Sequence, residues 1–376
     1  MREMSKLFHP FIATHEKDNW SSYTSPRMEF FNDDTIIPDV AFAAGFLVAV
    51  KRGFMDIPHI HDGADNYFIF TGADLENIFE SEFEVDFFIG DSAQSMEVYH
   101  ITKPSFIRVP AGVWHCPVFY KKVVRGLNNI LWYGGVSTGR VYPGAENNGK
   151  SELLYEKDNW VRPCVRDPEK LCTWCGFCFD QTEQEALAYV APFYENASAT
   201  DKYKDCVMEL RQDHHKLGDA VMSPRAAFKG VDDMSGADRQ FSFNTIVKPC
   251  VLGDDEPVSN GQVAEFLWFS GTDVVDPWDC FDAEIEIMLG EDPGNMQAVT
   301  FDKPGVVAVP PGFWRGSINV KRAGKPICFI PWYQHSDKRY KITQKTVDGR
   351  KRLIYDDEAT IENPTAGDEL FMQISR

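Results

Sequence analysis

Three histidines in the first third of the chain have the residue type and the spacing of metal ligands. His59 and His61 are two residues apart, so on a β-strand their side chains lie on the same face. His115 follows later, directly after the turn-forming segment Pro110–Trp114. Imidazole is a good ligand for divalent transition metals, and histidines from two strands can converge inside a narrow barrel. The alternative is that all three are core histidines that hydrogen-bond to the backbone.

The segment that ends in His115 occurs twice, and the second copy ends in an arginine. VPAGVWH at 109–115 corresponds to VPPGFWR at 309–315, an offset of 200 residues. Further matches at offsets of 200 or 199 are EVDFFIG (84–90) with EIEIMLG (284–290), Trp132-Tyr133 with Trp332-Tyr333, and FTGAD (70–74) with FSGTD (269–273). A repeat interrupted by one single-residue gap indicates two copies of one domain, each about 100 residues long.

Both copies have the sequence features of short β-strands. Residues 66–70 and 105–109 are aromatic and β-branched and are bounded by Gly, Pro and Asp, and residues 283–289 alternate between acidic and apolar side chains. Many short strands favour a sandwich or a small barrel. Between the copies, residues 201–222 have apolar side chains at roughly helical spacing, so we expect a helix there.

Two motifs in the first copy resemble those of the cupin superfamily. The first motif is matched, in order, by Gly53, His59, His61, Asp65 and Gly72, and the core of the second is matched by Pro110, Gly112 and His115. The sequence departs from the family pattern at three positions. Asp65 stands where the family usually has glutamate, Pro104 where it usually has glycine, and Phe119 where it often has asparagine. The resemblance covers both repeats.

This resemblance implies a mainly β fold of two cupin-type antiparallel jelly-roll barrels, a bicupin, with a partly helical insert between the barrels. The expected organisation is an N-terminal arm (1–40), a metal-binding barrel (41–150), an insert with a helix and a cysteine cluster (151–240), a degenerate barrel (241–345) and a C-terminal tail (346–376).

The resemblance also implies one metal ion in the first barrel, held by His59, His61, Asp65 and His115. Asp65 is one carbon shorter than glutamate, so it either binds the metal directly or holds a water or a neighbouring group. In the second copy the four positions are occupied by Val258, Asn260, Ala264 and Arg315. That barrel is therefore expected to be structural, or Arg315 binds an anion where the metal would lie.

Two charged residues are candidates for catalytic roles. Arg108 interrupts an apolar strand and either clamps a substrate carboxylate or points outward. Glu84 shares a strand face with Asp86 and is a candidate spare ligand or general base. Because Glu284 and Glu286 recur in the copy without histidines, a role in the barrel itself is the alternative.

The aromatic residues Tyr67, Phe70 and Trp114 are candidate walls of a substrate pocket. Trp114, like Trp132 and Tyr133, recurs in the second copy, and packing explains these three better. The insert contains a cluster of four cysteines, Cys164, Cys172, Cys175 and Cys178. Their spacing predicts either a second site, for zinc or an iron–sulfur cluster, or ordinary thiols.

Composition limits the partners. The formal net charge of −19 argues against nucleic acid and anionic membranes, which bind basic surfaces. No apolar run has the length of a signal peptide or a membrane span, and nine cysteines in a chain of 376 residues are typical of a reducing cytoplasm. Barrels with exposed sheet edges often pair, which favours a homodimer.

We therefore expect a cytoplasmic metal-dependent enzyme that acts on a small carboxylate, diketone or aromatic compound. A non-haem iron(II) dioxygenase is the first expectation. With manganese, nickel or zinc, a decarboxylase or an isomerase is the alternative, and a small-molecule-binding protein without catalysis is a third class.

Overall fold

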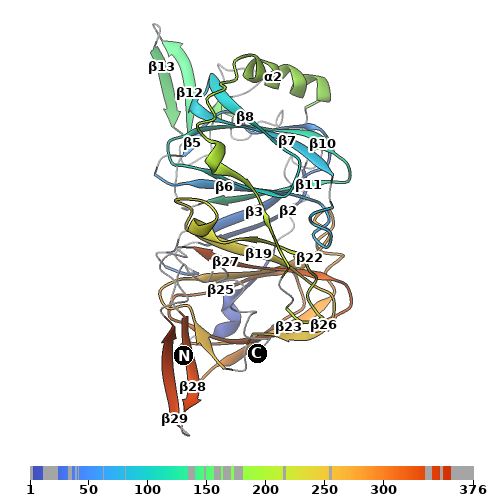
Figure 1. The fold of residues 1–376 in the computed structure, drawn as a ribbon, viewed down its shortest axis with the longest axis vertical. Coiled ribbons are helices and arrows are strands. Elements are labelled where there is room, and N and C mark those ends of the chain that lie inside the picture. The colour runs from blue at the N-terminus through green and yellow to red at the C-terminus, as the bar shows by residue number, and fades with distance from the viewer. Residues whose placement is uncertain are drawn as a thin grey trace.

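The computed structural model describes residues 3–11, 24–32, 36–38, 40, 42–61, 63–80, 82–133, 140–147, 150–155, 162–163, 171–172, 181–214, 217–253, 256–334, 341–347 and 350–356. Two β-barrels lie one above the other along the long axis of the molecule (Figure 1). Their strands pair antiparallel. The expected mainly β fold with two antiparallel jelly-roll barrels is confirmed.

The first barrel is built from two sheets. One has the strand order β4 (Gly53–Met55), β10 (Trp114–Val123), β7 (Phe83–Ser92) and β8 (Ser95–Ile101). The other has the order β16 (Val207–Glu209), β9 (Ser105–Val109), β6 (Asn66–Gly72), β11 (Leu127–Tyr133), β3 (Phe42–Ala49) and β2 (Thr24–Asn32).

The second barrel repeats this plan. One sheet has the order β1 (Phe8–Pro10), β25 (Gly305–Val309), β22 (Glu265–Gly271), β27 (Ile327–Gln334), β19 (Arg239–Ile246), β18 (Arg225–Phe228) and β17 (Arg211–Asp213). The other has the order β24 (Gln297–Phe301), β23 (Ala283–Gly290), β26 (Trp314–Ala323), β21 (Val258–Ser259), β28 (Lys341–Val347) and β29 (Arg350–Asp356), with β20 (Cys250–Leu252) also paired to β26.

A hairpin extends each barrel and lengthens the repeat. In the first copy it consists of β12 (Arg140–Asn147) and β13 (Lys150–Tyr155), and β12 pairs with β5 (Ile60–His61). In the second copy β28 and β29 form the equivalent hairpin on β21. The two hairpins lie at opposite ends of the molecule (Figure 1). The first hairpin therefore continues beyond residue 150 and the second beyond residue 345, the positions where the sequence placed the ends of the barrels.

Segments outside the repeats add strands to both barrels. The N-terminal arm supplies β1 to the second barrel and β2 to the first. In the insert, β16 pairs with β9 of the first barrel, and β17, which begins two residues later, pairs with β18 of the second. The arm and the insert therefore join the two barrels through backbone hydrogen bonds.

The helix predicted for residues 201–222 is wrong. Among its described residues, the segment forms the short 3-10 helix η3 (Lys204–Cys206) and the strands β16 and β17, because edge strands of both barrels offer it backbone partners. The helix of the insert is α2 (Glu183–Glu195). It begins at Thr182 with a capping box to Glu185, and it covers the outer face of the first barrel beside β8 (Figure 1). Two further 3-10 helices are η1 (Met4–Leu7) and η4 (Gly230–Asp232).

Three apolar cores hold the molecule together. One fills the interior of each barrel, and the third lies between them. In this third core the Phe42 and Phe266 rings stack at 3.9 Å, and the Trp132 and Trp332 rings meet edge to face at 4.7 Å. Trp132 and its repeat Trp332 recur because both pack in this shared core, as the packing interpretation predicts.

Among the described residues, no helix has both the length and the apolar character needed to cross a membrane.

Candidate metal centre

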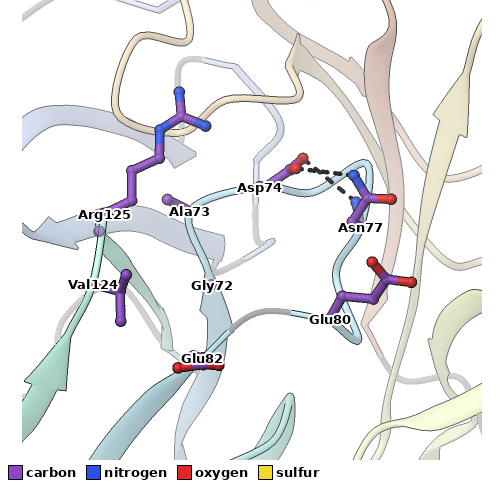
Figure 2. A pocket seen from close by; sticks show the side chains of 9 residues that line it. Gly72, Ala73, Asp74, Asn77, Glu80, Glu82, Val124 and Arg125 are labelled. Carbon is purple, nitrogen blue, oxygen red and sulfur yellow. Dashed lines mark hydrogen bonds between the residues drawn. The ribbon is translucent and has the colours of Figure 1, made fainter.

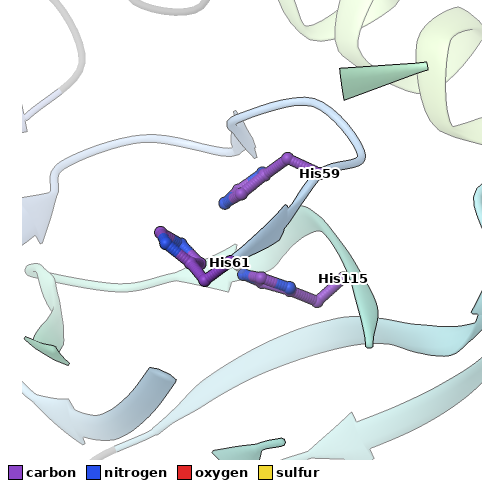
Figure 3. A group of neighbouring side chains, drawn as sticks. All are labelled: His59, His61 and His115. Carbon is purple, nitrogen blue, oxygen red and sulfur yellow. The ribbon is translucent and has the colours of Figure 1, made fainter. Parts of the chain in front are cut away.

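Two neighbouring backbone segments bring the three histidines together. His59, which precedes β5, and His115, on β10, lie opposite each other and exchange two backbone hydrogen bonds, of 3.1 and 3.0 Å. His61 follows on the same side of β5 as His59. All three side chains are buried inside the first barrel. Figure 3 shows the three rings facing one another.

The distances between the rings are those of a ligand set. The ring centroids lie 4.3 Å (His59–His115), 5.1 Å (His59–His61) and 5.4 Å (His61–His115) apart, and one ring nitrogen from each residue lies within 4.8 Å of the others. Two nitrogens bound to one ion at about 2.1 Å each lie at most about 4.2 Å apart. Small side-chain rotations would therefore complete the coordination.

Backbone carbonyls fix which nitrogen faces the centre. His59 Nδ1 lies 2.7 Å from the carbonyl oxygen of Ile57, and His115 Nδ1 lies 3.1 Å from that of Val113. Because a carbonyl oxygen only accepts, each Nδ1 carries the proton, and each Nε2 keeps the lone pair that a metal needs. The donor set therefore fits a divalent transition metal.

The strand parity of β6 decides which of its side chains face the histidines. The amide Nδ2 of Asn66 lies 3.3 Å from His115 Nε2, and the Phe68 ring lies 5.7 Å from the His115 ring. Phe70 is on the same face and packs in the barrel interior beside Phe87. Asn66 and Phe68 were not among the sequence candidates, although period-two alternation from Phe70 would have found them.

Tyr67, a predicted substrate-binding residue, points the other way. It is 2% exposed and packs between the barrels against Phe106 and Trp132. Burial raises the pKa of its hydroxyl. The alternation that brings Asn66 and Phe68 inward turns Tyr67 away from the histidines, so the structure does not support Tyr67 as a pocket wall. Trp114 is partly buried and packs against the core of the first barrel, immediately before His115.

Asp65 and Arg108 bind each other. Asp65 Oδ2 accepts from Arg108 Nε at 2.6 Å, and Asp65 Oδ1 accepts from the backbone N–H of Ala111 at 3.0 Å. The set of mutually close ligand atoms among the described residues contains only the three histidines. The candidate ligand Asp65 and the candidate substrate clamp Arg108 thus form an ion pair beside the centre.

Glu84 lies on the outer face of the barrel. In the β7–β10 pairing, His115 is opposite Ile89, so the odd-numbered residues of β7 share its face and Glu84 does not. Its Oε2 lies 3.8 Å from Nε2 of the partly exposed His100. The structure therefore does not bring Glu84 to the histidines.

The neighbouring acid, Asp86, makes contacts that are repeated in the second barrel. Asp86 pairs with Lys121 at 3.3 Å, and the equivalent Glu286 pairs with Lys321 at 2.6 Å. This repetition supports the interpretation that the acids of this strand belong to the barrel itself.

The cysteine cluster cannot be placed. Cys164, Cys175 and Cys178 lie outside the described residues. Cys172 is described only through its backbone, in the short strand β15 (Leu171–Cys172), which pairs with β14 (Arg162–Pro163). A second metal site there stays a prediction.

In the second barrel an ion pair occupies the equivalent position. Arg315 Nε donates to Glu265 Oε2 at 2.9 Å, and both side chains are almost fully buried. Glu265 pairs with Val309 as Asn66 pairs with Val109, so these two residues are equivalent. Because Glu265 neutralises the guanidinium, the arrangement favours the structural interpretation over an anion site at Arg315.

A separate pocket of about 290 Å³ lies at the other end of β6 and is drawn in Figure 2. Its wall includes Asp74, Glu80, Glu82 and Arg125. Asp74 accepts hydrogen bonds from Asn77, and Arg125 pairs with Asp273 of the second barrel. The Arg125–Asp273 pair places this pocket at the junction between the barrels.

Comparison with known structures identifies the fold. The chain is similar to vicilin from hazelnut, Corylus avellana (TM-score 0.53, 12% identity, covering 90% of this chain and 88% of that one). It is also similar to an oxalate decarboxylase from Lactobacillus farciminis in complex with formate (TM-score 0.50, 11% identity, 87% and 86% covered). This protein has the bicupin fold. No protein-family model and no curated protein sequence matches the chain.

The bicupin fold alone does not select a function. A vicilin from Solanum melongena, described with different anionic ligands in structurally similar pockets, is about as similar (TM-score 0.53, 9% identity, 90% and 87% covered). Vicilins and an oxalate decarboxylase therefore share this architecture, and the function has to be argued from the site.

Proposed function

We propose that this bicupin is a metal-dependent enzyme whose His59, His61 and His115 hold one divalent transition metal, and whose substrate is a small organic acid or an enolisable compound. The observation that carries the proposal is the geometry of the three buried histidines, with the Nδ1 atoms of two of them fixed by backbone carbonyls. Packing of a barrel does not require three such residues, and the second barrel has none at the equivalent positions.

The charge of the site supports an anionic substrate. Three neutral imidazoles leave the positive charge of a divalent cation uncompensated, so a carboxylate or an enolate would be attracted to it. When bound, such a metal supplies a Lewis acid and, if it is iron, redox chemistry. Phe68 and Phe87, which meet edge to face at 4.8 Å, would exclude water from the substrate, and the Asn66 amide would orient it.

Oxygenation by an iron(II) centre is the reaction we favour. Among the described residues, both candidate carboxylates are engaged elsewhere: Asp65, the candidate ligand, binds Arg108, and Glu84, the candidate general base, lies on the outer face of the barrel. A reaction that depends on a protein acid or base therefore has less support than one in which dioxygen oxidises the substrate and both oxygen atoms enter the product.

Metal-dependent decarboxylation is the second candidate. The same uncompensated charge favours it, since a substrate carboxylate can lose carbon dioxide without a protein base, and water can supply the proton that replaces the carboxylate on carbon. Binding of a small acid without turnover is the remaining alternative.

The test begins with metal analysis of protein purified without oxygen, followed by substrate assays. We expect close to one iron or other transition metal per chain, dioxygen uptake with one or more members of a panel of carboxylates, diketones and aromatic acids, and formation of an oxygenated product. Carbon dioxide release without dioxygen uptake would instead identify a decarboxylase, and saturable binding without turnover would identify a binding protein.

The variant His61→Ala should lose the metal and retain the fold, because it removes one of three ligands from a preformed barrel. His100→Ala is the matched control, since it removes a partly exposed histidine from the same barrel. Full metal content in purified His61→Ala would contradict the ligand assignment.

A further inference from the structure

The Asp65–Arg108 ion pair connects the two turns that carry the metal ligands. Asp65 follows His61 in the loop between β5 and β6, and its Oδ1 accepts from Ala111 in the turn before His115, at 3.0 Å. A second bond runs parallel, from the Gly112 N–H to the His61 carbonyl oxygen, at 2.9 Å. The carboxylate of Asp65 thus fastens one ligand-bearing turn to the other.

Arg108 extends this connection to the segment between the barrels. Its Nε donates to Asp65 at 2.6 Å, and its Nη1 donates to the carbonyl oxygen of Ser235 at 2.8 Å. The next residue, Gly236, has a φ of +78°, and a Cβ added there would lie 2.2 Å from Arg108 Nη1. Only glycine leaves room for the guanidinium at this position.

The second barrel shows that the turns form without the pair. Asp65 and Arg108 correspond to Ala264 and Ala308. A similar bond between the two turns is nevertheless present, from the Gly312 N–H to the carbonyl oxygen of Gly261, the residue after Asn260, at 2.5 Å. Both members of the ion pair are therefore absent from the barrel that lacks the histidines, and neither is needed for the barrel turn.

We propose that Asp65 and Arg108 are positioning residues: their ion pair holds the turns of His61 and His115 in the metal-binding arrangement and ties that arrangement to the Ser235-Gly236 segment. The inference rests on the proposed function, because it requires a metal at the three histidines. A partly exposed ion pair contributes little to stability by itself, so its effect is expected on metal affinity rather than on folding.

The first experiment replaces Asp65 and Arg108 by alanine, the residue that the second barrel has at both equivalent positions. In the double variant Asp65→Ala/Arg108→Ala, cobalt(II) should bind 10–100-fold more weakly, the size of effect typical for groups that orient metal ligands. The cobalt(II) absorption spectrum should also change, and thermal unfolding of the metal-free protein should stay close to that of the unmodified protein. Glu209→Gln is the control, because it breaks the exposed Lys103–Glu209 pair (3.1 Å) of the same barrel away from the turns.

The second experiment acts from the other end of the connection. Gly236→Ala should displace the guanidinium and weaken cobalt(II) binding, although residue 236 lies outside the metal barrel. Gly218→Ala is the matched control: its φ of +77° imposes the same backbone strain, but its Cβ would meet nothing within 4 Å.

The outcomes separate the two proposals. Wild-type cobalt(II) affinity and spectrum in the double variant would overturn the positioning role and leave the proposed function intact. Failure of the unmodified protein to bind cobalt(II), iron(II), manganese(II), nickel(II) or zinc(II) would overturn both. If the double variant does not fold, Asp65→Asn, which keeps the shape of the side chain, replaces it under the same criteria.

Discussion

Asn66 places a neutral amide beside His115, where the second barrel has the carboxylate of Glu265 against the guanidinium of Arg315. A carboxylate at this position is therefore compatible with the barrel when a cation lies next to it. Without the cation, a buried carboxylate is costly. The choice of asparagine keeps the metal-free barrel neutral and leaves the metal charge available to a substrate.

This comparison predicts the effect of Asn66→Asp. The carboxylate would face the metal, so cobalt(II) affinity should rise about tenfold or more, a gain of about 1.4 kcal/mol or more. Without metal the variant should unfold at a lower temperature than the unmodified protein. Titration and thermal unfolding with and without cobalt(II) measure both effects. Asn66→Ala serves as control, and equal affinities for the aspartate variant and the unmodified protein would disprove the prediction.

At the scale of residues, the sequence identified the three clustered histidines but not the side chains around them. His59, His61 and His115 could be predicted because two spacings and a repeated turn mark them. The direction of the Tyr67 side chain could not be predicted, because it depends on where β6 begins after residues 63–65. A shift of one residue in that start exchanges the two faces of the strand. The partner of Asp65 is set by tertiary contacts with β9.

At the scale of elements, strands of the two repeats could be predicted where the sequence pattern alone determines them. Strands β6, β9 and β23 lie where alternation and bounding turn residues indicate. The expected barrel bounds divide the hairpins: β12 and most of β28 fall inside them and most of β13 and all of β29 beyond, although Asn148-Gly149 and Asp348-Gly349 are typical hairpin-turn dipeptides. The error at residues 201–222 has another cause: strand edges of two different barrels, which are distant in sequence, override the helical propensity.

The carboxylate of Glu97 helps to hold the segment after α2 to the first barrel. Glu97 on β8 accepts from the Tyr99 and Thr200 hydroxyls and from the backbone N–H groups of Lys202 and Tyr203. Burial opposes ionisation of Glu97, but these hydrogen bonds outweigh it and lower its pKa below the ordinary 4.5. The ionised carboxylate therefore stabilises the folded state.

The sign of this shift gives a pH dependence. A lowered folded-state pKa contributes stability that is complete above about pH 4.5 and is lost as the pH falls through the folded value. Glu97→Gln should cost about 1–3 kcal/mol at pH 7, because the amide nitrogen cannot accept these hydrogen bonds. The deficit should shrink below pH 4.5 in denaturant unfolding. Glu195→Gln, at the exposed end of α2, is the control. A deficit that does not change with pH would contradict the role of the Glu97 charge.

The whole molecule is joined by its third core and by the strands that the arm and the insert contribute to both barrels. The proposed metal centre belongs to one barrel, whereas the Ser235-Gly236 segment that contacts Arg108 lies just before β19 of the other. If the barrels unfold as one unit, metal binding to the first stabilises the second as well, by an amount that follows from the concentration and affinity of the metal.

The variant Trp332→Ala tests whether the two barrels unfold as one unit because of the apolar core between them. Trp332 is fully buried against Trp132 and Phe241, and its truncation should cost about 3–5 kcal/mol. In calorimetry, the unmodified protein should show one transition that cobalt(II) shifts as a whole. The Trp332→Ala variant should show two transitions, and cobalt(II) should raise the temperature only of the transition that belongs to the first barrel. Trp332→Phe keeps a ring in the core and should retain the single transition. If the alanine variant also unfolds in one transition that responds fully to cobalt(II), the strands exchanged between the barrels, rather than the aromatic core, make the molecule one cooperative unit.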